Sequence, residues 1–152
     1  MKYVNTEVVF QEVPDETTLA INISNCPCQC KGCHSPYLAE DIGEEVTASS
    51  LIDLIKANKG ITCVAIMGGD AEPGEVEYYS KLVRKIFKLK YAWYSGKQIL
   101  PENIDISEFD YIKLGPYIEE LGGLKSPTTN QRLYKIVDGE MVDITYKLQN
   151  NV

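Results

Sequence analysis

The hydrophobic pattern predicts β-strands near both ends of the chain. Four segments have this character: residues 2–12, 17–24, Arg132–Val137 and Met141–Leu148. The second alternates apolar and polar positions and is rich in β-branched residues. Pro14-Asp15-Glu16 separates the first two segments and favours a turn. Asp138-Gly139 separates the last two and is a strong hairpin signal, so we expect a C-terminal β-hairpin.

The middle of the chain alternates helical and strand patterns. Apolar residues recur at helical spacing over residues 48–58 and 74–89. Short apolar runs predict buried strands at Ile61–Met67, Tyr91–Tyr94 and Tyr111–Leu114. The order strand, helix, strand, helix, strand implies parallel strands with right-handed crossovers. The chain is therefore predicted to be an α/β protein.

Three of the predicted strands end at glycine, namely at Gly68-Gly69, Gly96 and Gly115. Ligands of open α/β sheets bind outside the carboxyl ends of the strands. Glycine at such a position lets a ligand approach the backbone closely. We therefore expect a binding surface at this edge of the sheet, shared with the loop that follows residue 24.

Length and composition narrow the class of protein. The 152 residues fit a single domain, and 44% hydrophobic with 24% charged residues is ordinary globular usage. The net charge of −7 argues against binding of nucleic acid through broad electrostatics. The longest apolar run, Cys63–Met67, is far short of the about 20 residues that span a bilayer. Because no secretion signal is visible, we expect a cytoplasmic protein without a membrane partner.

Four of the five cysteines lie within eight residues, at Cys26, Cys28, Cys30 and Cys33, while Cys63 lies in a predicted strand. In a reducing compartment such a cluster more often binds metal or does redox chemistry than forms disulfides. A structural zinc site usually takes two separated ligand pairs, whereas an iron–sulfur cluster can be held from one tight loop. Only Cys26, Cys30 and Cys33 give the spacing C-x3-C-x2-C.

This triplet resembles the cysteine motif of the radical S-adenosylmethionine (SAM) enzymes. The resemblance implies that Cys26, Cys30 and Cys33 bind three irons of a [4Fe-4S] cluster and that SAM chelates the fourth. Gly68-Gly69-Asp70 resembles the family's Gly-Gly-Glu motif, which receives the SAM ammonium group. Tyr94-Ser95-Gly96 resembles a Tyr-Thr-Gly strand end, which implies that Ser95 and Gly96 line the same pocket.

Two further segments resemble one branch of that superfamily, the activating proteins of anaerobic ribonucleoside-triphosphate reductase. They are Asp110–Tyr117, which contains Gly115-Pro116-Tyr117, and Thr129–Arg132. Gly32 before the last cysteine also fits this branch. The resemblance covers roughly residues 15–137. Where many relatives have an Asp before the Gly-Pro segment, this chain has Leu114, so Lys113 becomes a candidate partner of the SAM carboxylate.

The resemblance implies an open, partial (β/α) barrel of radical SAM type with mostly parallel strands. It also implies an enzyme that cleaves SAM reductively and generates a glycyl radical on the reductase, with reduced flavodoxin or a similar protein as electron donor. The 5′-deoxyadenosyl radical would abstract the glycine hydrogen, so we assign no catalytic acid or base. Asn130, Gln131 and Arg132 are candidates for binding the partner protein or for capping the last hairpin.

Other interpretations stay open at this stage. Within the superfamily, the chain could activate another glycyl radical enzyme or act on a small molecule, as a 7-carboxy-7-deazaguanine synthase does. From a different class, the cysteine loop could form a non-catalytic zinc-binding module. Cys28 is interpreted as a non-ligand thiol in the loop, Cys63 as a small buried hydrophobic residue, and His34 is assigned no role.

Overall fold

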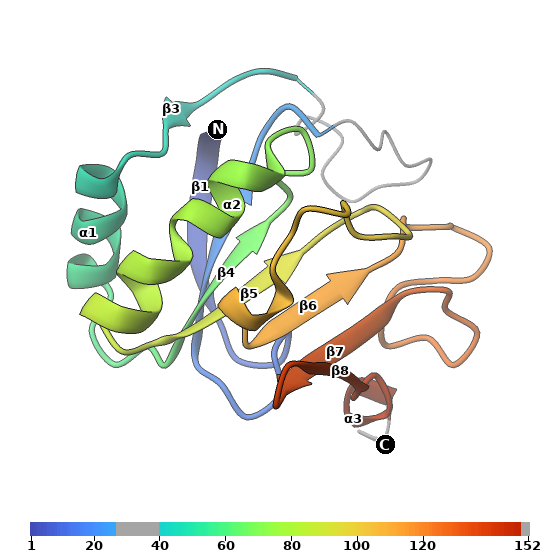
Figure 1. The fold of residues 1–152 in the computed structure, drawn as a ribbon. Helices are drawn as coiled ribbons and strands as arrows, with labels where there is room; N and C mark the ends of the chain where they lie inside the picture. The colour runs from blue at the N-terminus through green and yellow to red at the C-terminus, as the bar shows by residue number, and fades with distance from the viewer. Residues whose placement is uncertain (27–39, 150–152) are drawn as a thin grey trace.

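The computed structural model describes residues 1–26 and 40–149, whose strands form one sheet (Figure 1). Its order is β3-β1-β2-β4-β5-β6-β7-β8. The strands are β1 (Lys2–Val9), β2 (Thr18–Ile23), β3 (Glu44–Glu45), β4 (Cys63–Met67), β5 (Lys90–Tyr94), β6 (Tyr111–Leu114), β7 (Arg132–Val137) and β8 (Glu140–Asp143). Strands β2, β4, β5 and β6 are parallel neighbours. The other four neighbouring pairs are antiparallel.

Helical structure in the described residues is limited. The α-helices are α1 (Ala48–Ala57), α2 (Pro73–Tyr78) and α3 (Tyr146–Gln149), with a π-helical turn η2 (Leu82–Ile86) and a 3-10 turn η3 (Ile106–Glu108). Thr47 and Ser50 form a capping box that fixes the start of α1. Helices α1 and α2 cover one face of the sheet, whereas α3 lies at the opposite end beside β8 (Figure 1). None of these helices is long and apolar enough to cross a membrane.

The predicted fold class is wrong. The described sheet is mixed and mostly antiparallel, with two edge strands, β3 and β8, so it is not a partial radical SAM barrel. The parallel arrangement expected for the middle holds for β2, β4, β5 and β6, but it does not extend outward. A longer connection without a helix returns β7 antiparallel beside β6, and short connections join β1 to β2 and β7 to β8 as hairpins. Such hairpins produce antiparallel pairs, whereas a barrel needs repeated crossover helices.

The C-terminal β-hairpin is present, but its second strand is shorter than predicted. The expected turn is present, with φ of 51° at Asp138 and 78° at Gly139, as a type I′ hairpin requires. The second strand does not reach Leu148, however. It ends at Asp143, whose Oδ1 accepts a hydrogen bond from the Thr145 amide at 2.9 Å. This side chain turns the backbone, and α3 follows.

The helix expected over residues 74–89 is shorter and irregular. It begins at Pro73, a favourable first helical residue, and passes from α2 into η2. The Phe87 amide donates to the Leu82 carbonyl at 3.2 Å, the i to i−5 bond of a π-turn. Lys88, at a φ of 56°, then leaves the helical path and leads into β5.

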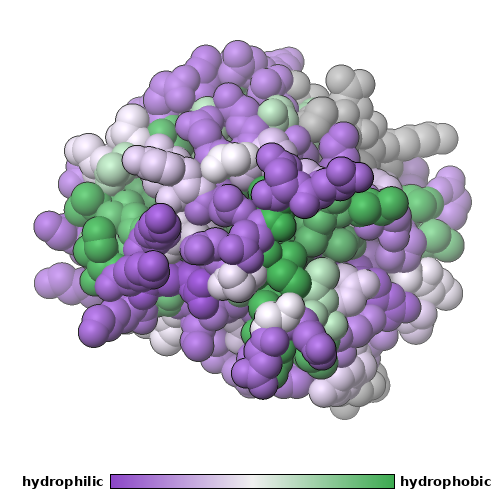
Figure 2. Space-filling view, in the orientation of Figure 1, coloured by the Kyte–Doolittle hydropathy of each residue, from purple (hydrophilic) through white to green (hydrophobic). Residues whose placement is uncertain are grey.

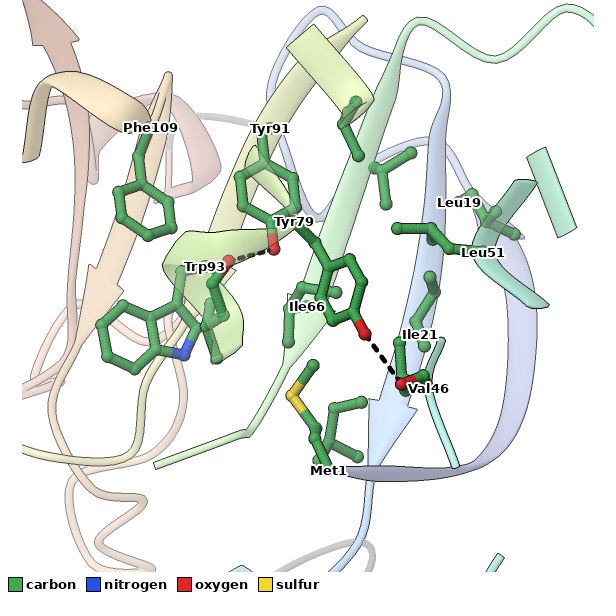
Figure 3. Packing of buried hydrophobic residues seen from close by; sticks show 14 of the residues in the cluster. Met1, Leu19, Ile21, Val46, Leu51, Ile66, Tyr79, Tyr91, Trp93 and Phe109 are labelled. Carbon is green, nitrogen blue, oxygen red and sulfur yellow. Dashed lines mark hydrogen bonds between the residues drawn. The ribbon is translucent and has the colours of Figure 1, made fainter. Parts of the chain in front are cut away.

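The main core lies between the sheet and its helices (Figure 3). Phe109 stacks on Tyr91 and Trp93, with ring centroids 5.5 and 5.8 Å apart. The buried Tyr91 hydroxyl donates to the Val76 carbonyl at 2.6 Å, and the Tyr79 hydroxyl donates to the Val46 carbonyl at 2.9 Å. Because these phenols keep hydrogen bonds, their rings can be buried at little polar cost. This core holds α2, and therefore the turn before it, against β4 and β5.

Candidate functional site

The parallel strands bring most of the predicted site residues to one edge. Cys26 follows β2, Gly68-Gly69-Asp70 follows β4, Ser95-Gly96 follows β5, and Gly115 follows β6. In Figure 1 the arrows of β4, β5 and β6 point the same way, so their carboxyl ends are neighbours. The prediction that these segments share an edge is consistent with the observed strand order. This edge is called the carboxyl edge below.

Asp70 joins two of these strand ends. Its Oδ1 accepts a hydrogen bond from the Ser95 hydroxyl, and its Oδ2 accepts one from the Gly96 amide at 2.8 Å. The Ser95 hydroxyl also accepts a hydrogen bond from the Lys97 amide at 3.0 Å. Hydrogen bonds to a charged group are among the stronger ones in proteins. The carboxylate therefore fixes the turn after β4 to the end of β5.

Lys113 joins the next pair of strand ends. Its side chain is buried, and the ammonium group donates to the carbonyls of Ser95 at 3.0 Å and Gly115 at 2.9 Å. The sequence suggested that this ammonium binds the carboxylate of SAM, which stays a prediction. The structure adds a second role, because the same group holds β5 and β6 together at the carboxyl edge.

The glycines of the turn after β4 are required by the protein itself. Gly68 and Gly69 have φ values of 110° and 83°, a region that side chains disfavour. A Cβ at Gly69 would lie 2.7 Å from Val76 Cγ2, and one at Gly68 would lie 3.3 Å from the Ile23 carbonyl oxygen. Close packing and positive φ therefore account for both glycines without a ligand.

The described part of the cysteine segment begins beside this turn. Cys26 is a half-buried free thiol. Ile23, Ser24 and Asn25 line a small cavity of about 170 Å³, which Gly69 and Glu72 also line. The chain thus enters the cysteine segment next to the turn after β4.

The other loop residues named above, Cys28, Cys30, Cys33 and His34, lie outside the described residues. Among the residues that the structure does describe, no group of three or more His, Cys, Asp or Glu side chains could hold a metal ion. The three-cysteine ligand set therefore stays a prediction from the spacing.

The Met1 amino group also helps to position the chain after β4, which the sequence did not predict. Its nitrogen lies 2.6 Å from Glu72 Oε2 and 2.9 Å from Glu75 Oε2. Burial alone lowers the pKa of this group, but hydrogen bonds and charge from the two glutamates outweigh it and raise the pKa to about 10. The contacts join residues more than 70 positions apart, so no local pattern could reveal them. They hold β1 against the helix that follows Asp70.

Asn130 and Gln131 support the turn after β6. The Asn130 side-chain amide donates to the Pro116 carbonyl at 3.0 Å, and the buried Gln131 side chain donates to the Gly115 carbonyl at 3.4 Å. Arg132 instead is exposed and lies 3.8 Å from Asp143. All three residues considered for partner binding therefore have contacts within the chain, and partner binding by them stays a prediction.

Cys63 is confirmed as a small buried residue of β4. It has no exposed surface, and burial raises the pKa of its thiol to about 12. It therefore stays protonated at neutral pH and is a poor metal ligand.

Comparisons with protein-family models, curated proteins and solved structures find no match to this chain. The described site is defined by three features. They are an aspartate that connects two parallel strand ends, a buried lysine that connects the next pair, and a cysteine segment that starts beside them.

Proposed function

We propose that the protein is a radical SAM activase that generates a glycyl radical on the anaerobic ribonucleoside-triphosphate reductase. The observation that carries the proposal is the placement of Asp70 at the carboxyl edge, bound to Ser95 and Gly96, beside the start of the cysteine segment. The proposal does not depend on a barrel, because the four parallel strands alone bring these segments together.

The residue types suit the two cofactors. Thiolates are the usual ligands of iron–sulfur clusters, and the spacing of Cys26, Cys30 and Cys33 leaves one iron for another ligand. When bound, a reduced [4Fe-4S] cluster supplies the electron for reductive cleavage of SAM, and the outcome is a radical on the reductase. The protein's own task is to hold both cofactors in register.

Asp70 and Lys113 divide the recognition of SAM in this proposal. A carboxylate attracts the ammonium group of the methionine part, and a lysine attracts its carboxylate. Both side chains are anchored to neighbouring strand ends, so they are oriented before the ligand arrives. Ser95 lies between them, because its hydroxyl donates to Asp70 and its carbonyl accepts from Lys113. Reduced flavodoxin or a similar protein as electron donor, and a cytoplasmic location, remain predictions.

The test is anaerobic reconstitution with iron and sulfide, followed by reduction with dithionite in the presence of SAM. Iron content and 5′-deoxyadenosine are measured for the wild type and for Cys26→Ala, Cys30→Ala and Cys33→Ala. We expect about four irons per wild-type chain and loss of SAM cleavage in all three variants. Cys28→Ala is the matched control from the same loop and should keep cleavage.

Stoichiometric zinc with no SAM cleavage would contradict the proposal. The cysteine segment would then be a structural zinc-binding loop. If the wild type cleaves SAM but produces a radical on a different protein, the activase would belong to another glycyl radical enzyme.

A further inference from the structure

Positive charge is concentrated in one segment of this acidic chain. Residues 78–101 contain six of the 15 Lys and Arg residues and none of the 22 Asp and Glu residues. The rest of the chain therefore carries nine basic residues against 22 acidic ones. An acidic binding partner would be repelled by most of this protein and attracted to one part of it.

The structure gathers this charge on one surface. Five of the six basic side chains line a groove of about 560 Å³, together with Glu108 and Asp110. The five are Lys81, Arg84, Lys85, Lys88 and Lys90. Arg84 is paired with Asp110, its Nε 3.2 Å from Oδ2. The four lysines form no ion pair with any residue in the described ranges and are exposed. In Figure 2 hydrophilic side chains gather at the lower left, where this helical segment ends in Figure 1.

Apolar side chains accompany the lysines. Tyr78 and Ile86 are 70% and 68% exposed. Both line a neighbouring groove that also contains Lys81 and three acidic residues, Glu77, Asp105 and Glu108. Aromatic and aliphatic anchors among charged residues are typical of protein interfaces. We call Tyr78, Lys81, Lys85, Ile86 and Lys88 the basic face.

A protein fits this surface better than a free phosphate does. Small anions are usually bound by the unpaired amides at the start of a helix. The groove lies instead at the end of the α2–η2 segment, where the Phe87 amide is already bonded to Leu82 and the helix dipole is negative. The lysine side chains therefore supply the electrostatic attraction. Tyr78 and Ile86 supply apolar surface that a partner can bury.

We propose that the basic face docks an acidic segment, carrying at least one apolar side chain, of the protein that receives the radical. This inference rests on the proposed function, because it deepens the identity of its protein substrate. The segment from Pro73 to Ile86 is roughly 20 Å long at 1.5 Å per residue. An interface of about 800 Å² per partner can cover that length, so one partner can contact this face and extend toward the carboxyl edge.

The test measures binding of the purified anaerobic reductase to the reconstituted activase at about 50 and 200 mM salt. The variant is Lys81→Glu/Lys85→Glu. The control is Lys56→Glu/Lys59→Glu, which makes the same charge change at exposed positions outside the basic face. We expect binding at least tenfold weaker for the first variant, with a smaller salt dependence, and within threefold of wild type for the control. Ile86→Ser should weaken binding about fivefold with an unchanged salt dependence.

Reductase binding that is unchanged in Lys81→Glu/Lys85→Glu, or equally weakened in both double variants, would overturn the docking surface. SAM cleavage without reductase, measured on the same preparations, separates this from failure of the proposed function. If cleavage is intact and binding is unchanged, only the docking surface is wrong. If the wild type neither cleaves SAM nor binds the reductase, the proposed function and its docking surface both fail.

Discussion

Two aspartates connect β5 to its neighbours at opposite ends of the parallel strands. Asp70 lies at the carboxyl edge and accepts hydrogen bonds from Ser95 and Gly96, which follow β5. Asp110 lies at the other end, where its Oδ2 accepts a hydrogen bond from the Tyr91 amide at 2.9 Å. In both cases a carboxylate bridges two strands through a backbone amide.

The surroundings of the two carboxylates differ. Asp110 is bonded to Arg84, so an internal cation balances its charge. The donors to Asp70 from the end of β5 are a hydroxyl and an amide, and the neighbouring chain leads to the cysteine segment. The same structural device thus holds strand ends together at both edges, and we propose a further role, binding of the SAM ammonium group, for Asp70 alone. On this proposal, two contacts that stabilise the fold in the same way differ in function.

The sharpest test of this contrast is the paired substitution Asp70→Asn and Asp110→Asn. Each replaces a carboxylate by an amide of similar shape, so each should lower the free energy of unfolding by about 1–3 kcal/mol. Only Asp70→Asn removes a charge that we assign to the SAM ammonium group, and we expect its rate of SAM cleavage to fall about 100-fold. Asp110→Asn should stay within about threefold of wild type. Equal losses of cleavage in both variants would remove the distinction between the two ends.

The next prediction compares two lysines near the carboxyl edge, the buried Lys113 and the exposed Lys97. Lys113→Met keeps much of the side-chain length but leaves the Ser95 and Gly115 carbonyls without this donor. We expect a loss of about 2–3 kcal/mol in the free energy of unfolding, measured by urea denaturation. Lys97→Met, at an exposed position nearby, should change it by less than about 0.5 kcal/mol. A Lys113→Met variant as stable as wild type would show that the ammonium group does not hold the strand ends.

The Met1 ammonium group should have the smallest effect on the free energy of unfolding, and this effect should depend on pH. Its pKa is about 10 in the folded chain against 8.0 for the free group. The stabilisation is therefore complete below pH 8 and is lost as the pH rises through 10. Between these values the wild type should lose about 1 kcal/mol more stability than Glu72→Gln, after allowance for screening of the half-exposed glutamate.

The matched control for this titration is Glu102→Gln, at an exposed position. It should follow the wild-type pH profile. A profile for Glu72→Gln that coincides with wild type between pH 8 and 10 would contradict the clamp between Met1 and the helix after Asp70.

Local patterns were enough to locate most of the elements. Strands β4, β5 and β6 lie where short apolar runs predicted them, and α1 covers most of the expected 48–58 segment. The glycine-marked strand ends lie at one edge, as expected for parallel neighbours. These features depend on residues close together in the sequence. The spacing of apolar residues and the residue types in the turns could therefore indicate them.

The features that the sequence did not predict depend mostly on contacts between residues far apart in the chain. The return of β7 beside β6 follows a connection of 17 residues without a helix, and no short pattern specifies that pairing. The Met1 contacts and the carbonyl partners of Lys113 are likewise tertiary. The end of β8 was misplaced for a local reason, because Asp143 turns the chain where apolar residues suggested a longer strand.

The most direct test of the central claim is the electron paramagnetic resonance spectrum of the reduced, reconstituted protein before and after addition of SAM. We predict a spectrum typical of a reduced [4Fe-4S] cluster that changes in wild type when SAM is added and changes much less in Asp70→Asn. A cluster spectrum that SAM leaves unaltered in wild type would contradict a SAM site at the carboxyl edge.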